Sequence, residues 1–140
     1  MTKEKFPLEF RKYGEFTFHS GGKSNVFCDV NSMLMDDSYI RKILDSIFDS
    51  KHYIGIATGG AIISRLISLE KGAKCTMVKD GELKGDSPLE DYVLIDDVVT
   101  TGNSLEEAIR IIGRNPKSIF VVVDRRRKNE NPEVYSLFEL

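Results

Sequence analysis

The sequence predicts an α/β fold in which a mostly parallel sheet is flanked by helices. Apolar, strand-like runs alternate along the chain with segments of helical periodicity. Strands joined through helices form βαβ units, which place helices on both faces of a parallel sheet. The length of 140 residues, with 41% hydrophobic residues, suits a single domain over residues 1–140. In sheets of this kind, ligands bind at the carboxyl ends of the strands.

The individual elements follow from local patterns. Short strands are expected at residues 14–18, 25–30, 53–57, 74–78, 92–96, 118–124 and 134–138. Helices are expected over 37–50, 61–72 and 104–113, where apolar residues recur at helical spacing and glycines follow two of the three segments. The first two strands flank the turn-rich SGGKS and form an N-terminal hairpin. The polar, glycine-bearing segment 79–91 is expected to be a loop.

Composition excludes several classes of function. The net charge of −2 provides no global field for nucleic acid, and the one basic run is RRRK at 125–128, of which 126–128 are expected to form a solvated turn. No apolar run is long enough to cross a bilayer. Cys28 and Cys75 have no neighbouring Cys or His at metal-ligand spacing, so both are expected to be reduced core residues. A soluble cytoplasmic protein is the expectation.

The segment VLIDDVVTTGNS, residues 93–104, combines two unusual features. Asp96 and Asp97 end a buried strand, and a turn of hydroxyl-bearing and glycine residues then leads into a helix. Backbone N–H groups, hydroxyls and a helix dipole together make a phosphate cradle. Taken singly, Asp97 could be a turn cap and Ser104 a helix cap. The GxGxxG and GxxxxGK[ST] phosphate motifs are both absent.

The same segment resembles the phosphoribosyl-pyrophosphate (PRPP) signature of type I phosphoribosyltransferases. The resemblance implies their Rossmann-like fold, here with a minimal N-terminal hairpin hood. It also implies that Asp96 and Asp97 hold the ribose hydroxyls and that the following turn holds the 5′-phosphate. IGIATGGAIIS at 54–64 resembles the family's pyrophosphate loop, although Gly59-Gly60 alone could be an ordinary tight turn. The implied PRPP-binding residues are Thr58, Gly59, Gly60, Asp96, Asp97, Val98, Val99, Thr100, Thr101, Gly102, Asn103 and Ser104.

Two further segments resemble orotate phosphoribosyltransferases in particular. YGEFTFHSGGKSNVFCDV at 13–30 resembles the hairpin that forms the pyrimidine side of their site. VVDRR at 122–126 resembles the strand end whose arginine pairs with the orotate carboxylate, and a planar guanidinium suits a carboxylate because two parallel hydrogen bonds form. For Phe27 alone, simple core packing is the competing interpretation. The implied orotate-binding residues are His19, Lys23, Phe27, Thr100 and Arg125, with Ser20 and Gly21 also matching the hairpin motif.

The resemblance weakens at the family's basic catalytic loop. VKDGELKG at 78–85 has two lysines and several acids where the family has a basic cluster, and only six residues separate Gly85 from Tyr92. Lys79 matches one basic position, and Lys84 matches a second if the alignment contains a local gap. The resemblance therefore implies catalytic roles for Asp96, Asp97, Lys79 and Lys84. A weakened basic cluster should lower the rate of transfer without preventing PRPP binding.

Three functions remain open from the sequence. The first is an orotate phosphoribosyltransferase that uses Mg²⁺, held mainly by PRPP and with Asp96 and Asp97 as the candidate protein ligands. The second is a phosphoribosyltransferase for another base, because the fold and the PRPP motif do not fix the acceptor. The third is a non-catalytic PRPP- or nucleotide-sensing protein. The resemblance also implies a homodimer, with PRPP and orotate as the small-molecule partners.

Overall fold

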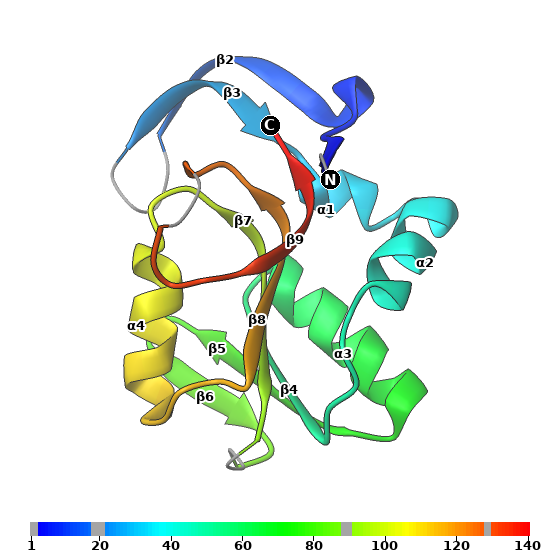
Figure 1. Ribbon diagram of the computed structural model, residues 1–140, viewed down its shortest axis with the longest axis vertical. Coiled ribbons are helices and arrows are strands. Elements are labelled where there is room, and N and C mark those ends of the chain that lie inside the picture. Colours follow the sequence, from blue (N-terminus) through cyan, green and yellow to red (C-terminus); the bar gives the residue numbers. More distant parts are fainter. Residues whose placement is uncertain (1–2, 18–21, 88–90, 128–129) are drawn as a thin grey trace.

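The computed structural model describes residues 3–17, 22–87, 91–127 and 130–140 (Figure 1). In these residues, seven strands form one sheet in the order β1-β9-β8-β7-β4-β5-β6. Every neighbouring pair is parallel except β5 and β6. The strands are β1 (Glu4–Lys5), β4 (His52–Ile56), β5 (Lys74–Lys79), β6 (Glu82–Gly85), β7 (Val93–Val99), β8 (Ser118–Asp124) and β9 (Tyr135–Glu139). The predicted mostly parallel sheet is confirmed.

Helices cover both faces of the sheet. Figure 1 shows α4 (Asn103–Ile112) on one side and α1 (Val30–Met33), α2 (Asp37–Asp45) and α3 (Gly59–Lys71) on the other. The core has two corresponding clusters, one including Ile63 and Ile95 and the other including Leu94 and Leu105. Leu94 and Ile95 belong to different clusters because successive residues of β7 point to opposite faces of the sheet. One helix-like turn, η1 (Leu8–Phe10), precedes the hairpin.

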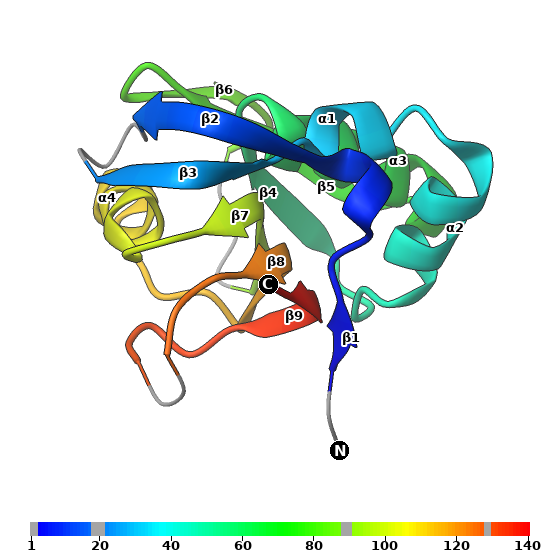
Figure 2. The same ribbon diagram turned by 90° about the horizontal axis from the view of Figure 1, so that it is seen from above.

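A separate two-stranded antiparallel sheet is formed by β2 (Arg11–Thr17) and β3 (Lys23–Cys28). Figure 1 shows this hairpin above the end of the main sheet at which α4 begins, and Figure 2 shows it crossing that end from above. Most of its residues are at least partly exposed. The predicted N-terminal hairpin is therefore present, and it lies over the edge where the carboxyl ends of the parallel strands meet.

The structure corrects several predicted boundaries. Strand β7 continues to Val99, so Asp96 and Asp97 lie inside the strand and not at its end. Segment 79–91 is not simply a loop, because 82–85 pair with β5 as strand β6. Helix α2 ends at Asp45, five residues earlier than predicted, and Phe48 is 43% exposed against Tyr135 instead of facing inward. Strand β1 and helix α1 were not predicted.

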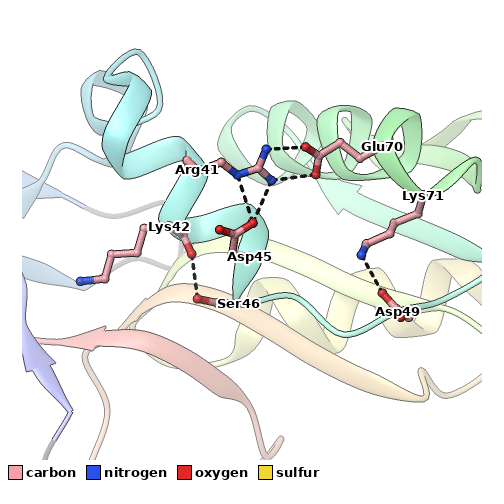
Figure 3. Close-up of polar contacts among 7 residues, drawn as sticks. All are labelled: Arg41, Lys42, Asp45, Ser46, Asp49, Glu70 and Lys71. Carbon is pink, nitrogen blue, oxygen red and sulfur yellow. Dashed lines mark hydrogen bonds and ion pairs between the residues drawn. The ribbon is translucent and has the colours of Figure 1, made fainter.

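Ion pairs fasten α2 to α3 across the surface of the molecule (Figure 3). The guanidinium of Arg41 donates from Nη2 to Glu70 Oε2 at 2.9 Å and from Nε to Asp45 Oδ1 at 3.0 Å. Lys71 Nζ lies 2.9 Å from Asp49 Oδ1. Only the bond to Glu70 joins the two helices, since Asp45 lies within α2 and Asp49 follows it, and these substantially exposed pairs each contribute little stability. In the described residues, no helix is both long enough and apolar enough to span a membrane.

Gly60 allows α3 to pack directly against β7. A Cβ atom at this position would lie 2.4 Å from the carbonyl oxygen of Ile95 and 3.0 Å from Asp96 Cα, both of them backbone atoms. We therefore expect Gly60→Ala to lower the free energy of unfolding by about 3 kcal/mol, because backbone atoms have to move to accommodate the methyl group. Urea denaturation followed by circular dichroism measures this change.

Ala61→Gly is the matched control for Gly60→Ala, since it exchanges the same two residue types at the next position. Ala61 lies in the first turn of α3, so the exchange is expected to cost about 1 kcal/mol from helix propensity alone. Equal losses for the two variants would show that close packing at Gly60 is not the reason for its glycine.

Candidate functional site

A cleft of about 790 Å³ lies at the carboxyl ends of the strands, and it brings together residues from five separate sequence segments. The acid pair of β7 and the turn before α4 form one part of its lining. The start of α3 and the end of β5 form a second part, and β3 with the residue after β8 forms a third. The predicted site residues among the described lining are Phe27, Thr58, Lys79, Asp96, Asp97, Val98, Val99, Thr100, Thr101, Gly102, Asn103, Ser104 and Arg125.

The two acids of β7 have different environments. Asp96 is 6% exposed, and its Oδ1 accepts a hydrogen bond of 2.8 Å from the backbone N–H of Asp97. Asp97 is half-buried, and its Oδ1 accepts a bond of 2.7 Å from the N–H of Val98. Burial and the neighbouring Asp97 raise the pKa of Asp96 well above the usual range of an aspartate. The pair therefore combines a carboxyl group that favours its protonated form with a more accessible carboxylate.

The raised pKa of Asp96 predicts an effect on stability with a definite sign. The folded state binds the Asp96 proton more tightly than the unfolded state, so ionising this residue reduces stability as pH rises above about 4. Asn cannot ionise and has nearly the same shape. We expect Asp96→Asn to raise the free energy of unfolding at pH 7.5. The gain should shrink towards pH 4, as measured by urea denaturation across this range.

The exposed Asp91 provides a control for the Asp96 substitution. Asp91→Asn removes the same charge from the surface, a few residues before β7, and its effect is expected to stay within about 0.5 kcal/mol at every pH. A destabilised Asp96→Asn at pH 7.5 would contradict the assignment of a buried carboxyl group whose ionisation is disfavoured.

The turn before α4 has the geometry expected of an anion cradle. Gly102 is the N-cap residue and has φ +92°, a left-handed conformation that favours glycine. No side chain caps the helix, and the N–H of Asn103 donates to Thr101 Oγ1 at 3.2 Å. Ser104 lies inside the first turn of α4, so its interpretation as a helix cap is wrong. Apart from the bond to Thr101 Oγ1, no side chain of the N-cap residue caps the helix, so the first turn of α4 offers N–H groups at the positive end of the helix dipole.

The start of α3 is a second helix N-terminus at the same cleft. Thr58 is its N-cap residue, makes no side-chain cap bond and lines the cleft. Gly59 and Gly60 are buried behind it and do not occur among the described cleft residues. A Cβ atom at Gly59 would lie 2.8 Å from Asp97 Oδ2. The two glycines thus allow α3 to lie close to the acid pair. The sequence had predicted that they contact PRPP directly.

Arg125 connects the sheet to the hairpin at the opposite wall of the cleft. It follows β8, and its backbone N–H donates to Val99 O at 2.9 Å. Its guanidinium donates from Nη1 to Val26 O at 2.9 Å and from Nη2 to Ser24 Oγ at 3.0 Å. These bonds hold the side chain in place at the cleft lining. A carboxylate in the cleft would meet a guanidinium that is already oriented.

The hairpin residues that were predicted from the orotate phosphoribosyltransferase motif lie in different places relative to the cleft. Phe27 lines the cleft and is 38% exposed, with its ring stacked on Phe16 at a centroid distance of 5.4 Å. Lys23 is exposed on β3 opposite Thr17 and does not occur among the described cleft residues. His19, Ser20 and Gly21 lie outside the described residues. Partial exposure of Phe27 at the cleft does not fit simple core packing.

A tight hairpin occupies the place of the expected catalytic loop. Strands β5 and β6 pair Lys79 with Glu82, so only Asp80 (φ +51°) and Gly81 (φ +76°) form the turn. Lys79 and the turn line the cleft. Lys84 pairs with Met77 further back along the hairpin, and its Nζ lies 3.4 Å from Glu82 Oε2. Lys84 therefore does not reach the described cleft lining, and the hairpin register is the reason.

Two residues of interest were missed by sequence reasoning. Asn31 of α1 lines the cleft beside Asp97, since a Cβ atom at Gly59 would lie 3.0 Å from Asn31 Oδ1. No sequence signal indicated it, because the predicted strand ends at residue 30 and no helix was predicted after it. The side chain of Arg126 is 2% exposed, so its prediction as part of a solvated turn is wrong. Cys28, predicted to lie in the core, is buried and also borders the cleft.

Comparison with known proteins relates this site to one group of enzymes. No protein-family model matches the sequence. The chain is 30% identical over 132 residues to the orotate phosphoribosyltransferase of Methanocorpusculum labreanum, an alignment that covers 81% of this chain and 76% of that protein. The crystal structure of orotate phosphoribosyltransferase from Aeropyrum pernix has a TM-score of 0.78 and 26% identity, covering 94% of this chain and 89% of that one.

The fold also occurs in an enzyme named for a different base. The crystal structure of adenine phosphoribosyltransferase from Rhodothermus marinus has a TM-score of 0.69 at 16% identity, covering 91% of this chain and 93% of that one. Likeness at this identity concerns the fold alone. The Aeropyrum pernix structure named for orotate, in contrast, resembles the chain in both fold and sequence.

Proposed function

We propose, because this chain belongs to the orotate phosphoribosyltransferase family, that it transfers the 5-phosphoribosyl group from PRPP to orotate. The products are orotidine 5′-monophosphate and pyrophosphate. The observation that carries the proposal is that one cleft joins the acid pair of β7 and the turn before α4 to Arg125. This arrangement provides for a phosphate, a ribose and a carboxylate at once.

PRPP would lie with its 5′-phosphate at the N-terminus of α4. Backbone N–H groups at the start of α4 and the hydroxyl groups of the turn supply donors, and the helix dipole favours a dianion. Asp97 accepts hydrogen bonds from the ribose hydroxyls. Asp96, with its raised pKa, can donate its proton to a ribose oxygen or accept from a hydroxyl. The acids do not repel the substrate in this arrangement, because they face the sugar and not the phosphate.

The diphosphate of PRPP would lie between Thr58 and Lys79. Both residues line the cleft, one at the uncapped start of α3 and the other at the end of β5. As the bond from C1′ to the diphosphate oxygen breaks, negative charge grows on the leaving group and positive charge grows on the sugar. Lys79 and the α3 dipole stabilise the negative charge on the diphosphate, and Asp97 stabilises the positive charge on the sugar. N1 of orotate then bonds to C1′ and its proton passes to the departing diphosphate, while Arg125 holds the orotate carboxylate.

Mg²⁺ is the cofactor that the family resemblance implies. The described residues contain no group of three or more His, Cys, Asp or Glu side chains suited to a metal. The acid pair alone suits an ion whose other ligands are substrate oxygens, so Asp96 and Asp97 would hold it together with PRPP. When bound, Mg²⁺ neutralises charge on the diphosphate. We extend the proposal to a cytoplasmic homodimer: the two cysteines are free, as in a reducing compartment, and the dimer follows from family resemblance alone.

The experiment that tests the proposal is a turnover assay with purified protein, orotate, PRPP and Mg²⁺, followed by the loss of orotate absorbance. Parallel reactions contain uracil or adenine in place of orotate, because neither carries the carboxylate that Arg125 would bind. Turnover with orotate alone is the expected result. Turnover with another base only would assign a different phosphoribosyltransferase. PRPP binding by calorimetry without any turnover would indicate the non-catalytic binding protein, which the short β5–β6 hairpin favours.

A further inference from the structure

Arg126 is buried although it belongs to the basic run that follows β8. Its side chain is 2% exposed, and its Nε lies 3.1 Å from Asp124 Oδ1. Nη2 donates to Asp124 Oδ2 at 3.3 Å, and the backbone N–H of Arg126 donates to Asp124 Oδ1 at 2.9 Å. Asp124 therefore holds one edge of the guanidinium in a fixed orientation.

The remaining nitrogen of this guanidinium is left without a partner. Nη1 of Arg126 is buried and makes no hydrogen bond within the described part of the chain. A buried, unsatisfied donor on a charged group is costly, and such groups generally mark a site for a water, an ion or a ligand. The orientation of Nη1 therefore indicates where an acceptor would be favoured.

Nη1 lies directly behind the turn that begins α4. A Cβ atom on Gly102 would be 3.5 Å from Nη1, and 3.2 Å from both Asn131 O and Pro132 Cδ. Gly102 is the N-cap residue of α4, where no side chain caps the helix. One side of this turn thus faces the cleft, and the other side packs against Arg126 and the segment before β9.

We propose that Arg126 is a positioning residue for the 5′-phosphate of the substrate, a role that rests on the proposed function. Its guanidinium packs behind Gly102 of the turn at residues 100–104, and, with Asp124 offsetting part of its charge, it leaves a buried N–H donor and positive potential next to the helix N-terminus. A phosphate monoester at the front of the turn gains from both effects, because the interior screens this charge less than water does. Arg126 thereby favours phosphorylated ribose over ribose.

The test measures binding of ribose 5-phosphate to the full chain by calorimetry, so it does not depend on turnover with orotate. We expect Arg126→Met to weaken this binding by about tenfold or more, and Arg126→Lys to recover part of it, because lysine restores charge but not the fork of nitrogens. Arg127→Met is the matched control at the next, exposed position and should bind as the wild type. In turnover assays, Arg126→Met should raise the KM for PRPP by a larger factor than it lowers kcat.

A measurement on the wild-type protein keeps the proposal testable if Arg126→Met does not fold. The ¹⁵N resonance of the Arg126 guanidinium should shift when ribose 5-phosphate is added and stay unchanged with ribose. No shift with either sugar, or a folded Arg126→Met that binds ribose 5-phosphate as the wild type does, would overturn the proposal. If the wild-type protein binds ribose 5-phosphate but does not turn over orotate, the proposed function is refuted and the role of Arg126 stands.

Discussion

Arg125→Ala is expected to lower kcat/KM for orotate by about a hundredfold, because it removes the guanidinium that would pair with the substrate carboxylate. An orotate carboxylate buried without its partner loses about 3 kcal/mol of interaction. PRPP binding should change little, since the acid pair and both helix N-termini are untouched. Steady-state assays with orotate varied, together with calorimetry of PRPP binding, measure the two effects separately.

Arg125 also donates to Val26 O and Ser24 Oγ, so its loss loosens the hairpin as well. Ser24→Ala separates the two roles: it removes one hairpin bond and keeps the guanidinium. We expect Ser24→Ala to retain more of the wild-type kcat/KM for orotate than Arg125→Ala does, because the guanidinium remains and its bond from Nη1 to Val26 O still orients it. A loss as large as that of Arg125→Ala would mean that the arginine acts through hairpin structure alone.

Asp97→Asn is expected to lower kcat/KM for PRPP by about a hundredfold or more. Asp97 is the accessible member of the acid pair, and Asn removes the negative charge that would stabilise the developing positive charge on the ribose. The effect should appear mainly in kcat, because the interaction strengthens as the bond at C1′ breaks. Steady-state kinetics with PRPP varied, at saturating orotate, measure it.

Asp80→Asn is the matched control for Asp97, because it removes one negative charge from the rim of the same cleft. Asn tolerates the left-handed backbone of this turn position, where φ is +51°. The turnover of Asp80→Asn should equal or exceed that of the wild type, since an acid near the leaving diphosphate opposes charge neutralisation. Similar losses in both variants would show that the reaction responds to the net charge of the cleft and not to the acid pair.

The parts of the fold that could be predicted are those encoded by local patterns. Strand β8 has its predicted bounds, because an apolar run between Pro116 and the basic segment allows few alternatives. Strand β1 could not be predicted, since two exposed residues pair with β9 from the other end of the chain. Strand β6 was missed although Asp80-Gly81 is a recognised hairpin signal, because the flanking residues are too polar to suggest a strand.

The candidate site was predictable where the chemistry sits in contiguous motifs. The acid pair, the turn before α4 and Arg125 do meet at one cleft, as predicted, although the acid pair lies inside β7 and not at its end. Lys84 and Arg126 were misplaced because their environments depend on pairing and packing that sequence periodicity does not contain. The hairpin register directs Lys84 towards Glu82, and contacts with Asp124 and Gly102 bury Arg126.

The two-residue turn between β5 and β6 also affects how the site handles water. The turn consists of Asp80 and Gly81 alone and is fixed by strand pairing on both sides. It is therefore too short to close over a bound substrate. The bound acceptor base itself then shields C1′, because it lies between the sugar carbon and bulk solvent. Until orotate is in place, water has access to C1′, so slow hydrolysis of PRPP is the side reaction to expect. Its suppression by orotate would report on how well the base closes the site.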